Sequence, residues 1–151
     1  MSERAIADTS ALIALEKINL LDVLCRIYTE IILPEAVINE FGTPPLKCYS
    51  TATVESPLVR LFVGDLNLGR GESEVIALAI ETGLRVIVDD LKARRVAETL
   101  GLNITGTIGI LLKAEKMGLI KSSYDKAKEL RVKGFFVSDK LLEDILKFSK
   151  T

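Results

Sequence analysis

The segment Arg85-Val-Ile-Val-Asp89-Asp90 is a short apolar run that ends in two adjacent carboxylates. Its β-branched residues, bounded by charged ones, predict a buried strand. Residues 91–100 follow directly with the periodicity of an amphipathic helix, which Gly101 ends. A buried strand joined to a helix is the repeating unit of α/β proteins, because parallel strands need a crossover connection. This stretch therefore predicts an α/β fold with a parallel sheet.

The same alternation of strand and helix continues on both sides of this segment. Further strands are expected at 4–8, 29–33 and 103–105, with an edge strand at 58–63. Helices are expected after Thr9, after Pro34, over 72–82 and after Gly106. Residues 46–56 are polar and lack periodicity, and a short helix is the expectation there. Strands separated by helices imply right-handed crossovers and a central parallel sheet with helices on both faces.

The C-terminal part of the chain reads differently from the rest. Residues 122–150 predict two amphipathic helices hinged near Gly134. A chain of 151 residues is long enough to bury one core of its own. We therefore expect an α/β domain over 1–121 and a helical extension over 122–151 that packs on the same domain.

Composition narrows the chemistry that the chain can perform. It has 20 basic and 21 acidic residues and a formal net charge of -1, so nucleic-acid binding would need a local basic patch. It has no His, which excludes His-based acid–base chemistry and His-ligated zinc. Any metal must therefore be a hard cation bound by oxygen.

The two cysteines, Cys25 and Cys48, do not have the spacing of metal ligands. Cys25 lies on an apolar helical face and is expected to be a small buried hydrophobic residue. The first residues show no signal-peptide pattern, and no apolar stretch is long enough to cross a membrane. These observations predict a cytoplasmic, reduced protein that does not bind membranes.

Four acidic residues stand at the edges of expected elements. Asp8 and Asp90 end apolar strands, which places them at the carboxyl edge of a parallel sheet, where sites form. Glu40 and Glu72 lie on helices that could lean over that edge. Because clustered carboxylates repel and raise each other's pKa, a divalent cation is the usual reason to hold them together. We expect Asp8 and Asp90 to ligate Mg²⁺ or Mn²⁺ directly, and the two glutamates to bind it directly or through water.

Each acid also has a simpler structural explanation. Asp8 can cap the helix that follows it, and Glu72 gains from the positive N-terminal end of its own helix. Glu40 can be an ordinary solvated residue, and Glu74 is expected to face solvent. The pair Asp89-Asp90 is harder to explain in this way, because one cap needs only one carboxylate. The metal site is predicted from the whole set of acids.

Several motifs, taken in order, resemble PIN-domain proteins, and most closely the small prokaryotic branch related to VapC-type toxins. The matching motifs are Asp8-Thr9-Ser10-Ala-Leu-Ile, the helix with Glu40, Gly71-Glu72-Ser-Glu74-Val-Ile-Ala-Leu-Ala, Val88-Asp89-Asp90-Leu-Lys-Ala-Arg94 and Gly106-Thr107-Ile-Gly-Ile-Leu. They cover roughly Arg4 to Ile120. The resemblance implies a three-layer α/β sandwich with an Mg²⁺- or Mn²⁺-dependent endoribonuclease site, often in a homodimer.

The resemblance also implies roles for individual residues. Asp8, Glu40 and Asp90 match the family's first, second and last acids, and Asp89 is an alternative for the last. The third acid, often Asp in the family, is Glu72 here, with Glu74 as the alternative. The hydroxyls of Thr9, Ser10 and Thr107 are expected to orient a phosphate or the attacking water. Arg94 lies one helical turn after Asp90 and is the residue expected to contact RNA.

Two functions are compatible with this resemblance. The first is a metal-dependent endoribonuclease of toxin–antitoxin type, whose partners are RNA and an antitoxin protein. The second is a degenerate PIN domain that serves as a protein- or RNA-binding scaffold. A scaffold would not depend on its carboxylates, so metal binding separates the two.

Overall fold

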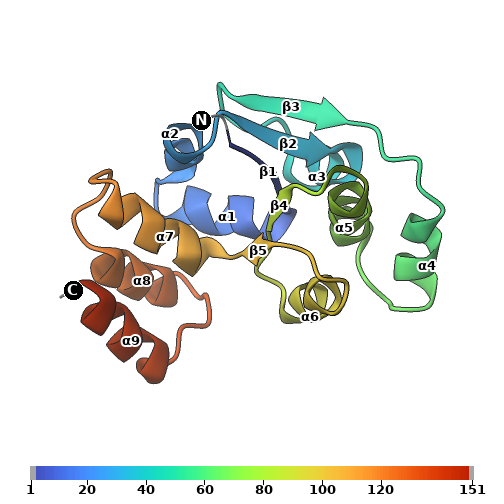
Figure 1. Cartoon of the computed structure of the whole chain (residues 1–151). Coiled ribbons are helices and arrows are strands. Elements are labelled where there is room, and N and C mark those ends of the chain that lie inside the picture. The colour runs from blue at the N-terminus through green and yellow to red at the C-terminus, as the bar shows by residue number, and fades with distance from the viewer. Residues whose placement is uncertain (1–2, 150–151) are drawn as a thin grey trace.

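The computed structural model describes residues 3–149 and contains one five-stranded parallel sheet (Figure 1). The strands are β1 (Arg4–Ala7), β2 (Glu30–Pro34), β3 (Tyr49–Ala52), β4 (Arg85–Ile87) and β5 (Ile104–Thr105). Their order across the sheet is β3-β2-β1-β4-β5, and every neighbouring pair is parallel. This confirms the predicted fold class, and four strands lie where the sequence predicted them.

Helices fill the connections between the strands. They are α1 (Thr9–Lys17), a short 3-10 helix (Leu21–Val23), α2 (Leu24–Ile27), α3 (Glu35–Phe41), α4 (Leu58–Gly64), α5 (Arg70–Thr82), α6 (Leu91–Thr99), α7 (Thr107–Lys116), α8 (Ser123–Val132) and α9 (Asp139–Ser149). The crossovers from β1 to β2 and from β3 to β4 run in opposite directions across the sheet. Right-handed connections therefore place α1 and α5 on opposite faces.

The central strands β1 and β4 each begin with an arginine and are apolar and buried after it, because helices cover both faces of the sheet. Ile6 pairs with Val86 in register, and both side chains are completely buried. On one face α5 packs against β1, β2 and β4, while α3 contacts both α1 and α5. The short helix α3 therefore bridges the two helical layers, and this brings its acidic residue towards the first turns of α1 and α5.

A second, smaller core joins the C-terminal helices to the rest of the protein. Helices α8 and α9 pack on α7 and on the outer side of α1. This core consists of Ala14, Ile18, Leu111, Ala127, Leu130, Val137, Leu142 and Ile145. Figure 1 shows α7, α8 and α9 together at one end of the molecule, with α4 at the other. The division of the chain into units 1–121 and 122–151 stays a prediction. Residues 1, 2, 150 and 151 of these units lie outside the described residues.

Two expected elements are wrong. Residues 58–64 form helix α4 and not an edge strand. The run from Leu58 to Val63 is apolar at odd and even positions alike, so alternation cannot identify a strand there; Val59 and Phe62, three residues apart, are the buried pair. Conversely, 49–52 form strand β3, which pairs with β2 at the sheet edge. Edge strands have one hydrogen-bonding partner and partial exposure, which explains why β3 lacks an apolar run.

The cysteines also differ from expectation. Cys25 and Cys48 form a disulfide across a sequence separation of 23 residues, so neither is a free thiol. The bridge ties α2 to the residue that precedes β3. None of the helices between residues 3 and 149 has the length and hydrophobicity that a bilayer span requires.

Candidate metal-binding nuclease site

The site lies where the strand order reverses. From β1 the chain first adds β2 on one side and later β4 on the other, so the carboxyl ends of β1 and β4 form the topological switch point. Asp8 directly follows β1, and its backbone N–H donates to the carbonyl of Ile87 at 3.0 Å. Asp89 follows β4 after one further residue. The sequence named Asp8 and Asp90 as the strand-end acids, with Asp89 as the alternative, and the structure places Asp89 close enough for its charge to act on Asp8.

Asp8 is the most deeply buried acid of the site, with 1% of its surface exposed. It caps α1, since Oδ1 accepts a hydrogen bond from the N–H of Ala11 at 2.9 Å. The hydroxyl of Ser10 donates to the same carboxylate at 2.9 and 3.0 Å. The pKa of Asp8 is raised to about 7. Burial is the main cause, and the charges of Asp89 and Glu72 act in the same direction, while the hydrogen bonds from Ala11 and Ser10 oppose it.

The adjacent acids Asp89 and Asp90 serve different helices. Asp89 Oδ1 accepts from the N–H of Thr107 at 2.7 Å, and the Thr107 hydroxyl donates to Oδ2, which ties the end of β4 to the start of α7. Asp90 caps α6, with Oδ2 accepting from the N–H of Ala93 at 3.0 Å. Arg94 Nη1 donates to the carbonyl of Val88 at 2.9 Å. The two carboxylates therefore diverge.

Glu40 reaches the site from α3. Its Oε1 accepts from the hydroxyl of Thr9 at 2.9 Å. The approach also depends on Gly71, because a Cβ placed there would lie 2.0 Å from Glu40 Oε1. A glycine near the start of a helix carries no turn requirement of its own, so the close approach explains it. The sequence reasoning did not assign this role to Gly71, although its place directly before Glu72 was a usable signal.

Glu72 and Glu74 have opposite surroundings, although both lie in the first turns of α5. Glu72 Oε1 accepts from the N–H of Gly69 at 3.1 Å. Burial raises the pKa of Glu72, and the charges of Asp90 and Glu40 act in the same direction. Glu74 is buried and does not face solvent as expected: Oε1 accepts from the N–H of Ala36 at 3.1 Å, and Oε2 pairs with Arg70. The structure thus brings Glu72 into the site, while Glu74 ties α5 to α3.

These contacts define the acidic cluster, which consists of Asp8, Glu40, Glu72, Asp89 and Asp90. Between residues 3 and 149, no Lys or Arg forms an ion pair with any of the five. A set of oxygen donors with uncompensated charge fits a hard divalent cation. In the described part of the chain, however, no three of these groups converge as a ready-made metal site. Each aspartate is instead bound by the N–H of a helix's first turn.

The polar residues predicted to contact substrate all lie at this site. Thr9, Ser10 and Thr107 each donate to a carboxylate of the acidic cluster. Arg94 and Asp89 both lie against Gly106, because a Cβ there would meet Arg94 Nη1 at 2.6 Å and Asp89 Oδ1 at 2.7 Å. The three hydroxyls therefore position the acids, and their predicted contact with substrate stays a prediction.

Comparison with known families identifies the family of the chain. Residues 4–151 match the PIN domain, and the chain belongs to the PIN-domain family. PIN domains are usually nucleases and generally use divalent metal ions. The matched region runs through α8 and α9, beyond the stretch over which the motifs resemble the family. A search of curated proteins finds no match to this chain.

Proposed function

We propose that this protein is an Mg²⁺- or Mn²⁺-dependent endoribonuclease that hydrolyses RNA phosphodiester bonds at the acidic cluster. The observation that carries the proposal is Asp8, a fully buried carboxylate that has no cationic partner among residues 3–149 and has two further acids close enough to raise its pKa. Such an arrangement costs folding free energy unless a cation binds it. Its place at the switch point of a PIN domain makes a metal-dependent nuclease the simplest explanation.

The residues in and around the acidic cluster have different proposed roles, in cation binding or in positioning the acids. Asp8, Glu72 and Asp90, with Glu40 and Asp89 beside them, would hold the cation after their side chains turn towards it, since no three of them converge among the described residues. When bound, the cation neutralises the charge of the attacked phosphate and lowers the pKa of a water molecule. Thr9 and Thr107 keep Glu40 and Asp89 turned towards the cluster. Because Asp8 has a pKa of about 7, cation binding at neutral pH would release a proton from it.

We further propose that the ribonuclease is the toxin of a toxin–antitoxin pair. Under this assignment, the protein acts on cellular RNA, forms a homodimer and is held inactive by an antitoxin protein. Co-expression with the product of a small neighbouring gene tests this directly. A neighbouring gene product that binds the chain and blocks its RNA cleavage would support the assignment.

The decisive experiment is cleavage of structured RNA by the purified protein with Mn²⁺, with and without EDTA. We expect metal-dependent cleavage that Asp8→Asn and Glu72→Gln each lower by at least about a hundredfold, since each removes a charge from the site. Asp22→Asn, which removes an exposed carboxylate of the short 3-10 helix that is not part of the cluster, is the matched control. Cleavage that persists in the Asp8→Asn protein would indicate a contaminating nuclease and contradict the proposal.

Metal binding can be measured separately from activity. A cation that binds only the folded state stabilises it by about 2.7 kcal/mol at a hundred times its Kd. Saturating Mn²⁺ should therefore raise the melting temperature of the wild-type protein and have little effect on Asp8→Asn. A melting temperature that Mn²⁺ leaves unchanged in both proteins would favour the competing function, a PIN-domain scaffold that binds RNA or protein without cleaving it.

A further inference from the structure

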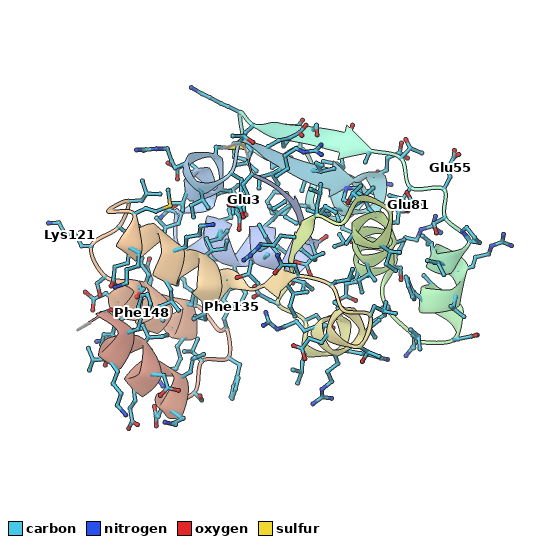
Figure 2. The ribbon with its side chains drawn as sticks, in the orientation of Figure 1. Glu3, Glu55, Glu81, Lys121, Phe135 and Phe148 are labelled. Atoms are coloured by element: carbon cyan, nitrogen blue, oxygen red, sulfur yellow. A yellow bond between two sulfur atoms is a disulfide. The ribbon has the colours of Figure 1, made fainter. Side chains whose placement is uncertain are left out.

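A concave surface lies next to the acidic cluster, between the segment that follows β3 and the starts of α4 and α5. Its volume is about 470 Å³, and its polar lining comes from Glu55, Ser56, Arg60 and Arg70. Figure 2 shows Glu55 on the connection between β3 and α4, with its side chain directed outward. We call this surface the arginine pocket. Its two guanidinium groups distinguish it from the acidic cluster.

The two arginines of the pocket differ in how they are held. Arg70 Nε donates to Glu74 Oε2 at 2.9 Å, yet 63% of the Arg70 side chain remains exposed. This bond engages Nε alone, and Arg70 lines the pocket. Arg60 is exposed on α4 and has no ion pair or hydrogen bond to another side chain among residues 3–149. The pocket therefore offers one ion-paired and one uncommitted cation.

The pocket and the acidic cluster share the first turn of α5. Arg70 is the first residue of that helix, Gly71 touches Glu40, and Glu72 belongs to the cluster. Successive helical residues point about 100° apart, so Arg70 and Glu72, two positions apart, extend from different sides of one helix end. Glu74, the partner of Arg70, also binds the first turn of α3, the helix that carries Glu40. An RNA chain that leaves the acidic cluster around the N-terminal end of α5 would therefore meet the pocket.

Two other basic residues near the cluster already donate to backbone carbonyls. Arg94 donates to the carbonyl of Val88, and Lys92 donates to the carbonyl of Asn67 at 3.3 Å. RNA binding needs cations that can neutralise phosphates, and a protein of net charge -1 must supply them locally. Guanidinium suits this role because it donates two parallel hydrogen bonds to phosphate oxygens.

We propose that the arginine pocket binds a backbone phosphate of the RNA adjacent to the one attacked at the acidic cluster, with Arg60 and Arg70 as the donors. This inference rests on the proposed function, because it assumes that RNA occupies the cluster. Glu55 opposes phosphate binding and limits its strength. The ligand is therefore a phosphodiester in a nucleic-acid chain, held in place by its other contacts, and not a free phosphate ion.

The test measures the affinity of a fluorescent single-stranded oligoribonucleotide as a function of salt, in Ca²⁺ to suppress cleavage. Losing one phosphate contact should reduce the magnitude of the slope of log K against log salt by about 0.7, and Arg60→Ala should weaken binding about three- to tenfold at low salt. Arg60→Lys keeps the charge and should keep the slope. Glu55→Gln removes the opposing charge and should tighten binding.

The matched control is Arg26→Ala, since Arg26 is an equally exposed arginine on α2, ahead of the amino end of β2. If Arg60→Ala and Arg26→Ala have the same affinity and slope, the pocket does not bind RNA. Stabilisation of the wild-type protein by inorganic phosphate alone, lost in Arg60→Ala, would show a free-anion site and also overturn the inference. Cleavage assays of the same proteins in Mn²⁺ report on the proposed function independently. If cleavage depends on metal but Arg60→Ala does not change RNA binding, only the proposed role of the arginine pocket is contradicted.

Discussion

The buried carboxylate of Asp8 should make this protein less stable as the pH rises. Its pKa is about 7 in the folded protein, against an ordinary value of 3.8, and burial is the main cause. The folded state therefore holds the proton more tightly than the unfolded chain does, so protonation favours folding. The destabilisation is absent below about pH 3.8, grows through the window up to about pH 7 and is complete above it.

The size of the effect follows from the shift in pKa. A shift from 3.8 to about 7 corresponds to a loss of about 4 kcal/mol in the free energy of unfolding at high pH. Of this, about 2 to 3 kcal/mol falls between about pH 5 and about pH 8, because the unfolded carboxyl is already largely ionised at the lower value. Asp8→Asn removes the ionisation but retains an oxygen that can accept from the N–H of Ala11. The variant should lose this part of the pH dependence and be more stable than wild type above about pH 7.

Urea denaturation at several pH values, in EDTA to remove divalent cations, measures the free energy of unfolding directly. The difference between wild type and Asp8→Asn isolates this one group, because all other titrating groups are common to both proteins. Asp22→Asn, at an exposed aspartate, should run parallel to wild type across the same range. If the curves of wild type and Asp8→Asn are also parallel, Asp8 does not have a raised pKa and the electrostatic argument for the site fails.

Two further predictions concern Gly71 and the Cys25–Cys48 disulfide. Gly71→Ala places a Cβ 2.0 Å from Glu40 Oε1, so RNA cleavage should fall at least about tenfold. Because Ala replaces Gly within a helix, the free energy of unfolding should stay within about 1 kcal/mol of the wild-type value. Gly64→Ala, where the added Cβ meets no atom within 4 Å, should leave cleavage unchanged, and equal cleavage by both variants would contradict the packing argument. Reducing the Cys25–Cys48 disulfide should lower the free energy of unfolding by about 3 kcal/mol, because the bridge closes a loop with a separation of 23 residues. Cys48→Ser should show the same loss and no response to reductant, whereas a wild-type denaturation midpoint indifferent to reductant would argue against the bridge.

Much of the fold was predictable from the sequence by itself. The central strands are continuous apolar runs, and such runs arise where helices cover both faces of a sheet. Parallel strands end at one edge, so the position of Asp8 after β1 and of the pair Asp89-Asp90 after β4 predicted acids at that edge, but it did not decide which of the pair lies nearer Asp8. The absence of His limited the donors to oxygen. Each of these inferences uses only a local pattern and a general rule of chain connection.

Only the tertiary structure decided which neighbouring side chain does what. Glu72 and Glu74 occupy one helix two residues apart, and the packing of α5 on α3 buries Glu74 against Ala36 and leaves Glu72 in the acidic cluster. The same holds for 58–64, whose apolar residues fit a strand or a helix until Val59 and Phe62 find their core partners. A local pattern fixes the conformation of a segment, but the partners of its side chains depend on segments far away in the chain, and those partners determine the chemistry of the site.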